Sequence, residues 1–182
     1  MLDRERLNEA LTLLGRDLSR RGLLIELAVC GGRALILQFD WRRMTQDVCA
    51  VVREGHEEAK LGPSVAHVAR QMGLQDDWLN NAVGMFTPLE EPEDLFEFSG
   101  NYPPGEQPGL RVVVANPRYM LALKLVALKS VNRGDRDLND ARRLAAHLDI
   151  RSEDELLGLY RCIHDEDPPY EVASRFSQVL GG

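Results

Sequence analysis

Leu23–Phe39 reads LLIELAVCGGRALILQF: a short apolar run, two adjacent glycines and a second apolar run. Because a short apolar run bounded by turn residues is typical of a buried strand, we predict a strand over Leu23–Cys30. Gly31 and Gly32 interrupt this strand, and Arg33–Phe39 is predicted as a short helix. Glycines between a strand and a helix let the backbone approach a phosphate, although most such pairs are simply tight turns.

The segments around this stretch predict a strand-rich first part. Leucines at helical spacing before Gly22 predict an opening helix. Gly84–Gly109 is rich in Pro, Gly and Glu, which is typical of a long loop. The other predicted elements are strands at Gln46–Arg53, Leu95–Phe98 and Leu110–Ala115, and helices at Ser64–Met72 (stopped by Gly73) and Asp76–Ala82.

The last third of the chain predicts helices. Asn116 can cap a helix and Pro117 suits its first position, so a helix is expected from there to about Val131. A second is expected at Asp137–His147, a third after the capping-box pattern that starts at Ser152, and a last one from Pro168-Pro169 to the terminus. We therefore predict an α/β (α+β) fold in a single domain, 1–182. It would have a small mixed sheet flanked by helices in about 1–115, and a helical part in about 116–182.

Composition limits the class of protein. The 182 residues are 44% apolar and 28% charged, as in an ordinary globular domain. No apolar run approaches the roughly 20 residues that cross a bilayer, the amphipathic N-terminus is unlike a signal peptide, and the three cysteines suggest neither disulfides nor zinc. We therefore expect a cytoplasmic protein that does not associate with membranes.

Charge is distributed unevenly. The net charge is −7, which argues against a general nucleic-acid coat protein. Residues 111–143, however, hold eight basic and three acidic residues and are locally +5. A basic region of this kind can attract a phosphate-bearing ligand, or it can be a solvated helix face.

Arg43–Cys49, RMTQDVC, places a carboxylate at the start of an apolar strand. Since side chains alternate along a strand, Thr45, Asp47 and Cys49 are expected on one face. A carboxylate in this setting needs a partner such as an amide, an arginine or a metal. Asp47 is therefore a candidate metal ligand, or a residue that caps a turn or pairs with Arg43.

Lys124 is the sole charge in Tyr119–Leu128, YMLALKLVAL. A helix that is apolar nearly all round is expected to be buried, and lysine is rarely buried without a partner. Lys124 either extends to the surface or reaches into a phosphate site. Asp137 and Asp140, three residues apart, are expected on one side of the next helix.

Several short motifs then occur in a characteristic order: VCGGRAL, RMTQDV, WLN, KLVALK and RDLNDARRL. Together, from about Ala28 to Leu144, they resemble the AbiEii-type minimal nucleotidyltransferases of bacterial toxin–antitoxin and phage-defence modules. That family has a small mixed sheet, binds a nucleoside triphosphate (NTP) with Mg²⁺, and transfers a nucleotidyl group to RNA or protein. The resemblance implies an NTP substrate, tRNA or another RNA as acceptor, and a cognate toxin or antitoxin as partner.

The resemblance also implies residue roles. Asp47 would hold Mg²⁺, Lys124 would contact the triphosphate, and Asp140 would be the late acid near the reacting centre. Asp140 in a salt bridge to Arg133 or Arg136 is the structural alternative, and Asp137 is a supporting position. The nucleotide-binding positions would be Gly31, Gly32, Arg43, Thr45 and Arg133.

Position 49 departs from the pattern. Many nucleotidyltransferases carry Asp-x-Asp on this strand, whereas this chain has Cys49, and a thiol is a poor ligand for Mg²⁺. Three hypotheses follow: an active nucleotidyltransferase, a catalytically degraded binding module of the same fold, such as an antitoxin or regulatory subunit, or an unrelated scaffold in which Asp47 and Lys124 form a buried ion pair.

Overall fold

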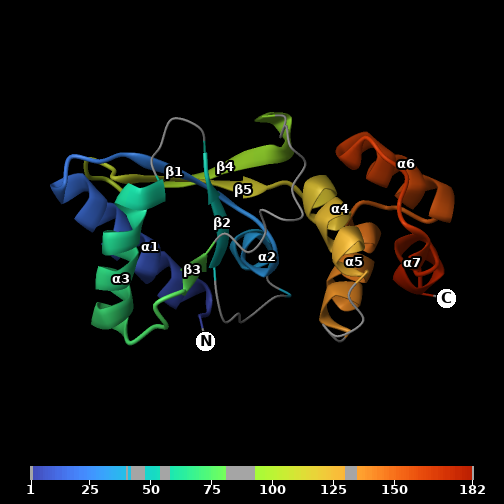
Figure 1. Ribbon diagram of the computed structural model, residues 1–182, viewed down its shortest axis with the longest axis horizontal. Helices are drawn as coiled ribbons and strands as arrows, with labels where there is room; N and C mark the ends of the chain where they lie inside the picture. Colours follow the sequence, from blue (N-terminus) through green and yellow to red (C-terminus); the bar gives the residue numbers. More distant parts are fainter. Residues whose placement is uncertain are drawn as a thin grey trace. The chain divides into compact units, whose positions relative to one another are not determined.

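The computed structural model describes residues 2–39, 41, 48–53, 58–80, 93–129 and 135–181. The chain forms two compact units (Figure 1): unit 1 is Met1–Gly84 with Phe96–Ala115, and unit 2 is Met85–Leu95 with Asn116–Gly182. The fold class is mixed α/β, as predicted, with the strands in unit 1 and the long C-terminal helices in unit 2. The change from strands to helices after Ala115 falls where the sequence placed it, while the single domain over 1–182 stays a prediction.

Unit 1 is built on a mixed sheet with the strand order β3-β2-β1-β5-β4. The central strand β1 (Ile25–Val29) runs parallel to β5 (Leu110–Ala115) and antiparallel to β2 (Val48–Val52). At one end β4 (Phe96–Tyr102) pairs antiparallel with β5, and at the other β3 (Leu79–Asn80) pairs parallel with β2. Of the apolar run that predicted the first strand, Ile25 and Leu27–Cys30 are buried because β1 lies at the centre of this sheet.

Helices α1 (Arg4–Arg20) and α3 (Glu58–Met72) pack side by side in unit 1, and α1 lies against β4 and β5 (Figure 1). The Asp3 carboxylate caps α1 by accepting a hydrogen bond of 2.9 Å from the Arg6 backbone N–H. The leucines that predicted α1 form its buried face: Leu7, Leu11, Leu14 and Leu18. The short helix α2 (Gly32–Gln38) follows β1 directly, as predicted.

Unit 2 contains a 3₁₀ turn, η1 (Glu93–Leu95), and the helices α4 (Pro117–Ala127), α5 (Arg136–His147), α6 (Glu153–His164), α7 (Tyr170–Ala173) and α8 (Phe176–Val179). Asn116 caps α4 through its side-chain oxygen, which accepts from the Tyr119 N–H at 2.9 Å. Ser152 and Glu155 form the predicted capping box of α6. Both starts were readable because the cap residues satisfy backbone donors that the first helical turn leaves unpaired.

Three sequence predictions are wrong. In place of the helix predicted at Asp76–Ala82, Leu79–Asn80 form β3, because the buried Trp78 donates to the Val65 carbonyl at 3.1 Å and fixes the segment beside β2. Strand β4 extends past Phe98 to Tyr102, inside the stretch predicted as a loop. The single last helix is instead two short ones, α7 and α8.

Two helix boundaries also differ from the prediction. Helix α3 begins at Glu58, before Ser64, and includes Pro63. Helix α4 ends at Ala127, before the predicted Val131, which lies outside the described residues.

Among the described residues, the helices are all too short or too polar to cross a membrane.

Candidate functional site

Lys124 lies on α4 among buried apolar residues, and only 11% of its side chain is exposed. Its ammonium nitrogen is 2.5 Å from Asp137 Oδ1 and 2.9 Å from Asp140 Oδ2. Both aspartates lie on α5, three residues apart, so their side chains reach the same side of that helix. Lys124 thus does not extend into solvent, whereas its place in a phosphate site stays a prediction.

The three side chains form one charged cluster, which we call the Lys124 cluster: Lys124, Asp137 and Asp140. The Asp137 side chain is 14% exposed and that of Asp140 is 3% exposed, so the cluster sits in a region that little water reaches. Charges in such a region are tolerated when they are paired. An ammonium group has three N–H donors. Among the described residues, Lys124 donates to Asp137 and is ion-paired with Asp140, so at least one donor is left for a ligand oxygen.

Asp140 was predicted as the late acid, with a salt bridge to Arg133 or Arg136 as the alternative. In the structure it pairs with Lys124. Arg136 is an exposed residue at the start of α5, and Arg133 lies outside the described residues. Asp137 was ranked as a supporting position, yet it makes the shorter contact with Lys124. The three-residue spacing of the two aspartates, so close to a lone lysine, was the signal for this cluster.

The predicted glycine turn is present in unit 1. Gly31 is the residue before α2 and has φ +69°, a conformation that side chains rarely adopt, while a Cβ atom there would meet no atom within 4 Å. Glycine is therefore required at this turn by backbone conformation and not by crowding. This confirms the turn, whereas the phosphate role of Gly31 and Gly32 stays a prediction.

The other predicted site residues fall outside the described part of the chain. These are Arg43, Thr45, Asp47 and Arg133. Cys49 lies in β2, in register with Asn80 of β3, and its strand neighbour Val48 is fully buried. The structure thus brings together Lys124 and Asp140, and it leaves the Asp47 part of the predicted site as a prediction.

The carboxylates of the Lys124 cluster are the oxygen donors that Mg²⁺ prefers, whereas the Cys49 thiol is not. Within the ranges that the structure describes, no group of three or more His, Cys, Asp or Glu could hold a metal ion.

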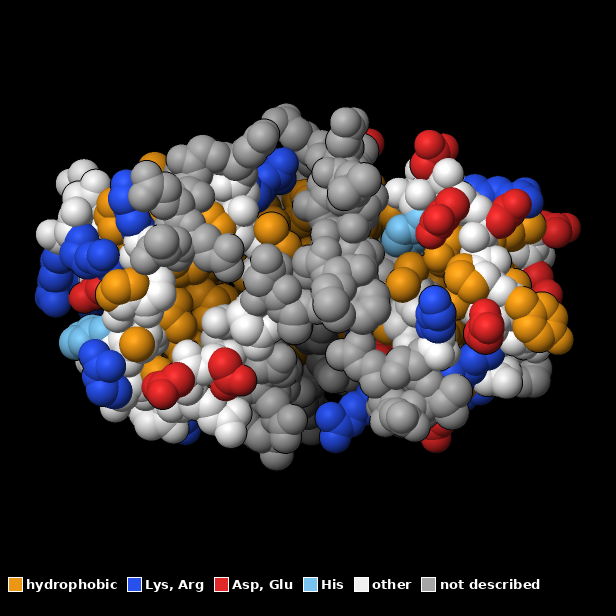
Figure 2. Space-filling view, viewed as in Figure 1, with side chains coloured by type: hydrophobic (Ala, Val, Ile, Leu, Met, Phe, Trp, Pro, Cys, Tyr) orange, Lys and Arg blue, Asp and Glu red, His pale blue; other side chains and the backbone are white. Residues whose placement is uncertain are grey.

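The basic residues of 111–143 differ in burial. Among those that the structure describes, most are exposed: Arg111, Arg118, Lys129, Arg136 and Arg143. On the face drawn in Figure 2, acidic and basic side chains are interspersed over unit 2. This distribution matches a solvated surface for the exposed residues and sets Lys124 apart by its burial.

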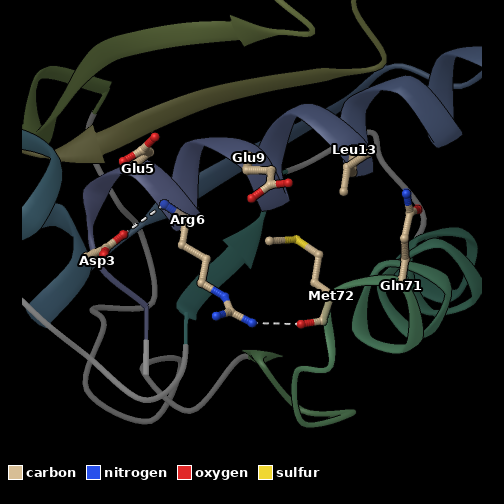
Figure 3. A pocket seen from close by; sticks show the side chains of 7 residues that line it. All are labelled: Asp3, Glu5, Arg6, Glu9, Leu13, Gln71 and Met72. Carbon is tan, nitrogen blue, oxygen red and sulfur yellow. Dashed lines mark hydrogen bonds between the residues drawn. The ribbon is translucent and has the colours of Figure 1, made fainter.

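Two surface cavities in the described residues do not contain the predicted site. One, of about 360 Å³, lies between α1 and α3 in unit 1 and is lined by acidic side chains around Arg6, which donates to the Met72 carbonyl at 2.8 Å (Figure 3). Its acids, Asp3, Glu5 and Glu9, would repel a triphosphate. The other, of about 350 Å³, lies in unit 2 beside Arg142 and Arg151. Its lining includes none of the residues of the Lys124 cluster.

Comparisons of the chain with family models, with curated proteins and with solved structures found no match. A functional assignment therefore depends on the motifs of the sequence and on the geometry of the described residues.

Proposed function

We propose that this chain is a nucleotidyltransferase-like protein of a toxin–antitoxin type system. It would bind an NTP with Mg²⁺ and transfer a nucleotidyl group to RNA or protein. The observation that supports this most is the Lys124 cluster: a lysine with an 11% exposed side chain that is held by two aspartates of the next helix and, among the described residues, keeps an N–H donor for a ligand.

A purely structural role accounts poorly for this cluster. Removing charges from water costs several kcal/mol per ion, and replacing a buried ion group by apolar residues of similar size is often neutral or stabilising. The remainder of α4 consists almost wholly of buried apolar residues, so an apolar side chain at position 124 would fit the pattern of that helix. A lysine with two acids is better explained by a ligand that needs them.

The chemistry of the cluster suits phosphate transfer. The third N–H of Lys124 would donate to a phosphate oxygen and stabilise the departing pyrophosphate. The Asp140 carboxylate would orient the acceptor hydroxyl or take its proton. Asp47, Thr45, Arg43, Arg133 and the Gly31-Gly32 turn are assigned to the nucleotide by the resemblance. When bound, Mg²⁺ would supply charge neutralisation on the phosphate oxygens.

Calorimetric titration with ATP, CTP, GTP and UTP, with and without Mg²⁺, tests the binding step. We expect one or more triphosphates to bind, and Lys124→Gln to weaken that binding at least about tenfold, because a hydrogen bond to a charged group is lost. Lys129→Ala is the matched control, since Lys129 is an exposed lysine just after the same helix. If no triphosphate binds at millimolar concentration, the nucleotidyltransferase proposal is wrong.

Cys49 favours a second candidate: a binding module of the same fold that has lost activity and acts as an antitoxin or regulatory subunit. If a missing carboxylate limits the site, Cys49→Asp should strengthen Mg²⁺-dependent NTP binding and raise nucleotidyl transfer. Cys162→Asp, at an exposed cysteine of α6, is the control. The binding module would be favoured if the wild type binds an NTP but is inactive, and if Cys49→Asp does not make it active.

A further inference from the structure

One face of the unit 1 sheet carries a cluster that the nucleotide site does not use. We call it the arginine–aromatic patch, and it consists of Glu26, Arg53, Phe96, Phe98 and Arg111. The strand registers pair Arg111 with Glu26, Phe98 with Val113 and Phe96 with Ala115, so alternation places these side chains on one face. Arg53 directly follows β2, and its N–H donates to the Glu26 carbonyl at 3.2 Å.

The patch is held together by two kinds of contact. The Glu26 carboxylate joins the arginines: one oxygen is 3.0 Å from Arg111 Nε and the other is 3.5 Å from Arg53 Nε. Each guanidinium also lies over a phenylalanine ring, Arg53 at 5.0 Å from the Phe96 centroid and Arg111 at 5.3 Å from that of Phe98. Stacking and ion pairing therefore fix the orientation of both guanidinium groups.

Part of the patch is open to solvent. Phe98 is 59% exposed, and so is 52% of the Arg111 side chain. Leu24, two residues before Glu26, is also an exposed large apolar residue. Each arginine uses Nε for Glu26, and among the described residues the terminal nitrogens of both have no partner. The patch thus offers two oriented guanidinium forks beside an exposed aromatic ring.

The charges favour a protein partner over a nucleic acid. With Glu26 included, the patch is only +1 and its two arginines could neutralise few phosphates, whereas affinity for a nucleic acid grows with the number of phosphates that are neutralised. Arginine and aromatic residues are, in contrast, the side chains that are enriched where proteins bind one another. Guanidinium forks with free terminal nitrogens match carboxylates in a two-point geometry.

We propose that the arginine–aromatic patch is a docking surface for an acidic segment of a partner protein, in which an apolar side chain lies between two carboxylates. The carboxylates would bind the terminal nitrogens of Arg53 and Arg111, and the apolar side chain would cover Phe98. This proposal is independent of the proposed nucleotidyl transfer, because it uses none of the residues assigned to that reaction.

A fluorescein-labelled peptide of alternating Glu and Val tests the proposal by fluorescence anisotropy on the full chain. We expect it to bind in a salt-sensitive manner, and Arg111→Glu or Phe98→Ser to weaken it at least about tenfold. Arg16→Glu is the matched control, since Arg16 also has a single 3.0 Å pair, with Glu106, and a 40% exposed side chain. All three substitutions, at Arg111, Phe98 and Arg16, are at exposed side chains, and circular dichroism verifies that each variant is folded.

Three further measurements test the other possible occupants of the patch. The first two use a labelled peptide of alternating Lys and Val and a labelled single-stranded oligouridylate, and the third is sedimentation of the chain alone. Binding of the acidic peptide with loss in Arg111→Glu and not in Arg16→Glu supports the proposal. The proposal is overturned if the acidic peptide does not bind, or if the basic peptide binds equally well. It is also overturned if the oligouridylate binds more tightly, or if the chain self-associates and Phe98→Ser abolishes that self-association.

Discussion

At the scale of single residues, Lys124 is expected to contribute to stability because its ammonium lies against two aspartates. Replacing it by Met removes the cation that lies between Asp137 and Asp140 and leaves two carboxylates in a region with little water. We expect Lys124→Met to lower the free energy of unfolding by about 3 kcal/mol. Urea unfolding measures this change.

The matched variant adds Asp137→Asn and Asp140→Asn to Lys124→Met. Because the triple variant also removes the two carboxylate charges that face the ammonium, we expect it to recover much of the lost stability. A Lys124→Met variant as stable as the wild type would show that the ammonium does not hold the two acids in solution.

His164 gives the fold a dependence on pH. Burial lowers the pKa of its imidazole from 6.5, against smaller opposing effects from the Ala122 carbonyl and the Glu166 charge. Among the described residues, its Nε2 is buried without a hydrogen-bond partner, and its ring lies 4.5 Å from that of Tyr160. The folded state therefore resists a proton that the unfolded state accepts.

As pH falls below about 6.5, the unfolded chain binds more protons than the folded chain. The free energy of unfolding therefore falls as the solution becomes more acidic. We expect His164→Phe to lose less stability than the wild type between pH 7.5 and pH 5.5, measured by urea unfolding. His67→Phe, at an exposed histidine, is the control and should keep the wild-type dependence. Identical pH dependence in His164→Phe and the wild type would contradict this account.

Sequence reasoning found Lys124, Asp137 and Asp140 because a lone charge in an apolar helix needs partners, and two acids at helical spacing followed it. It did not find the arginine–aromatic patch. Glu26 and Arg111 belong to β1 and β5 and Arg53 directly follows β2, so only the strand order and registers bring them together. Non-local pairing of this kind is not encoded in any short motif.

At the scale of elements, α1 lies very close to the end of β4. A Cβ atom on Gly15 would lie 2.3 Å from the Tyr102 carbonyl oxygen, and one on Gly109 would lie 2.2 Å from the Gly15 carbonyl oxygen. These neighbours are backbone atoms, which cannot move without shifting the helix or the strand. Only glycine at both positions allows this approach.

We expect Gly15→Ala to destabilise the chain by about 2 kcal/mol, because the added methyl forces α1 away from the sheet. Gly158→Ala is the matched control: it also lies inside a helix, α6, and its Cβ would meet no atom within 4 Å. There the better helix propensity of alanine should stabilise by up to about 1 kcal/mol. Opposite shifts of the melting temperature are the expected result, and two shifts of the same sign would contradict the packing described.

Elements with local signals were predictable, and those that depend on distant partners were not. Helices α4 and α6 have cap residues in the sequence, and β1 and β5 are apolar enough to be recognised alone. Strand β3 is two residues long and exists because it pairs with β2, and β4 is polar over much of its length because it lies at the end of the described strand order. Neither pattern predicts a strand without knowledge of the neighbouring strand.

At the scale of the whole molecule, the central claim is nucleotidyl transfer. The most direct measurement is incorporation of labelled nucleotide from each of the four NTPs, with Mg²⁺, into a mixed tRNA pool and into protein. The comparison is between the wild type, Lys124→Gln, Asp140→Asn and the surface control Lys129→Ala. We predict incorporation by the wild type and by Lys129→Ala. In Lys124→Gln and Asp140→Asn we predict a decrease of at least about 100-fold, since each would lose a group that the proposed function places on the reacting phosphate or hydroxyl. No incorporation by the wild type with any NTP, or full activity in Lys124→Gln, would contradict the claim.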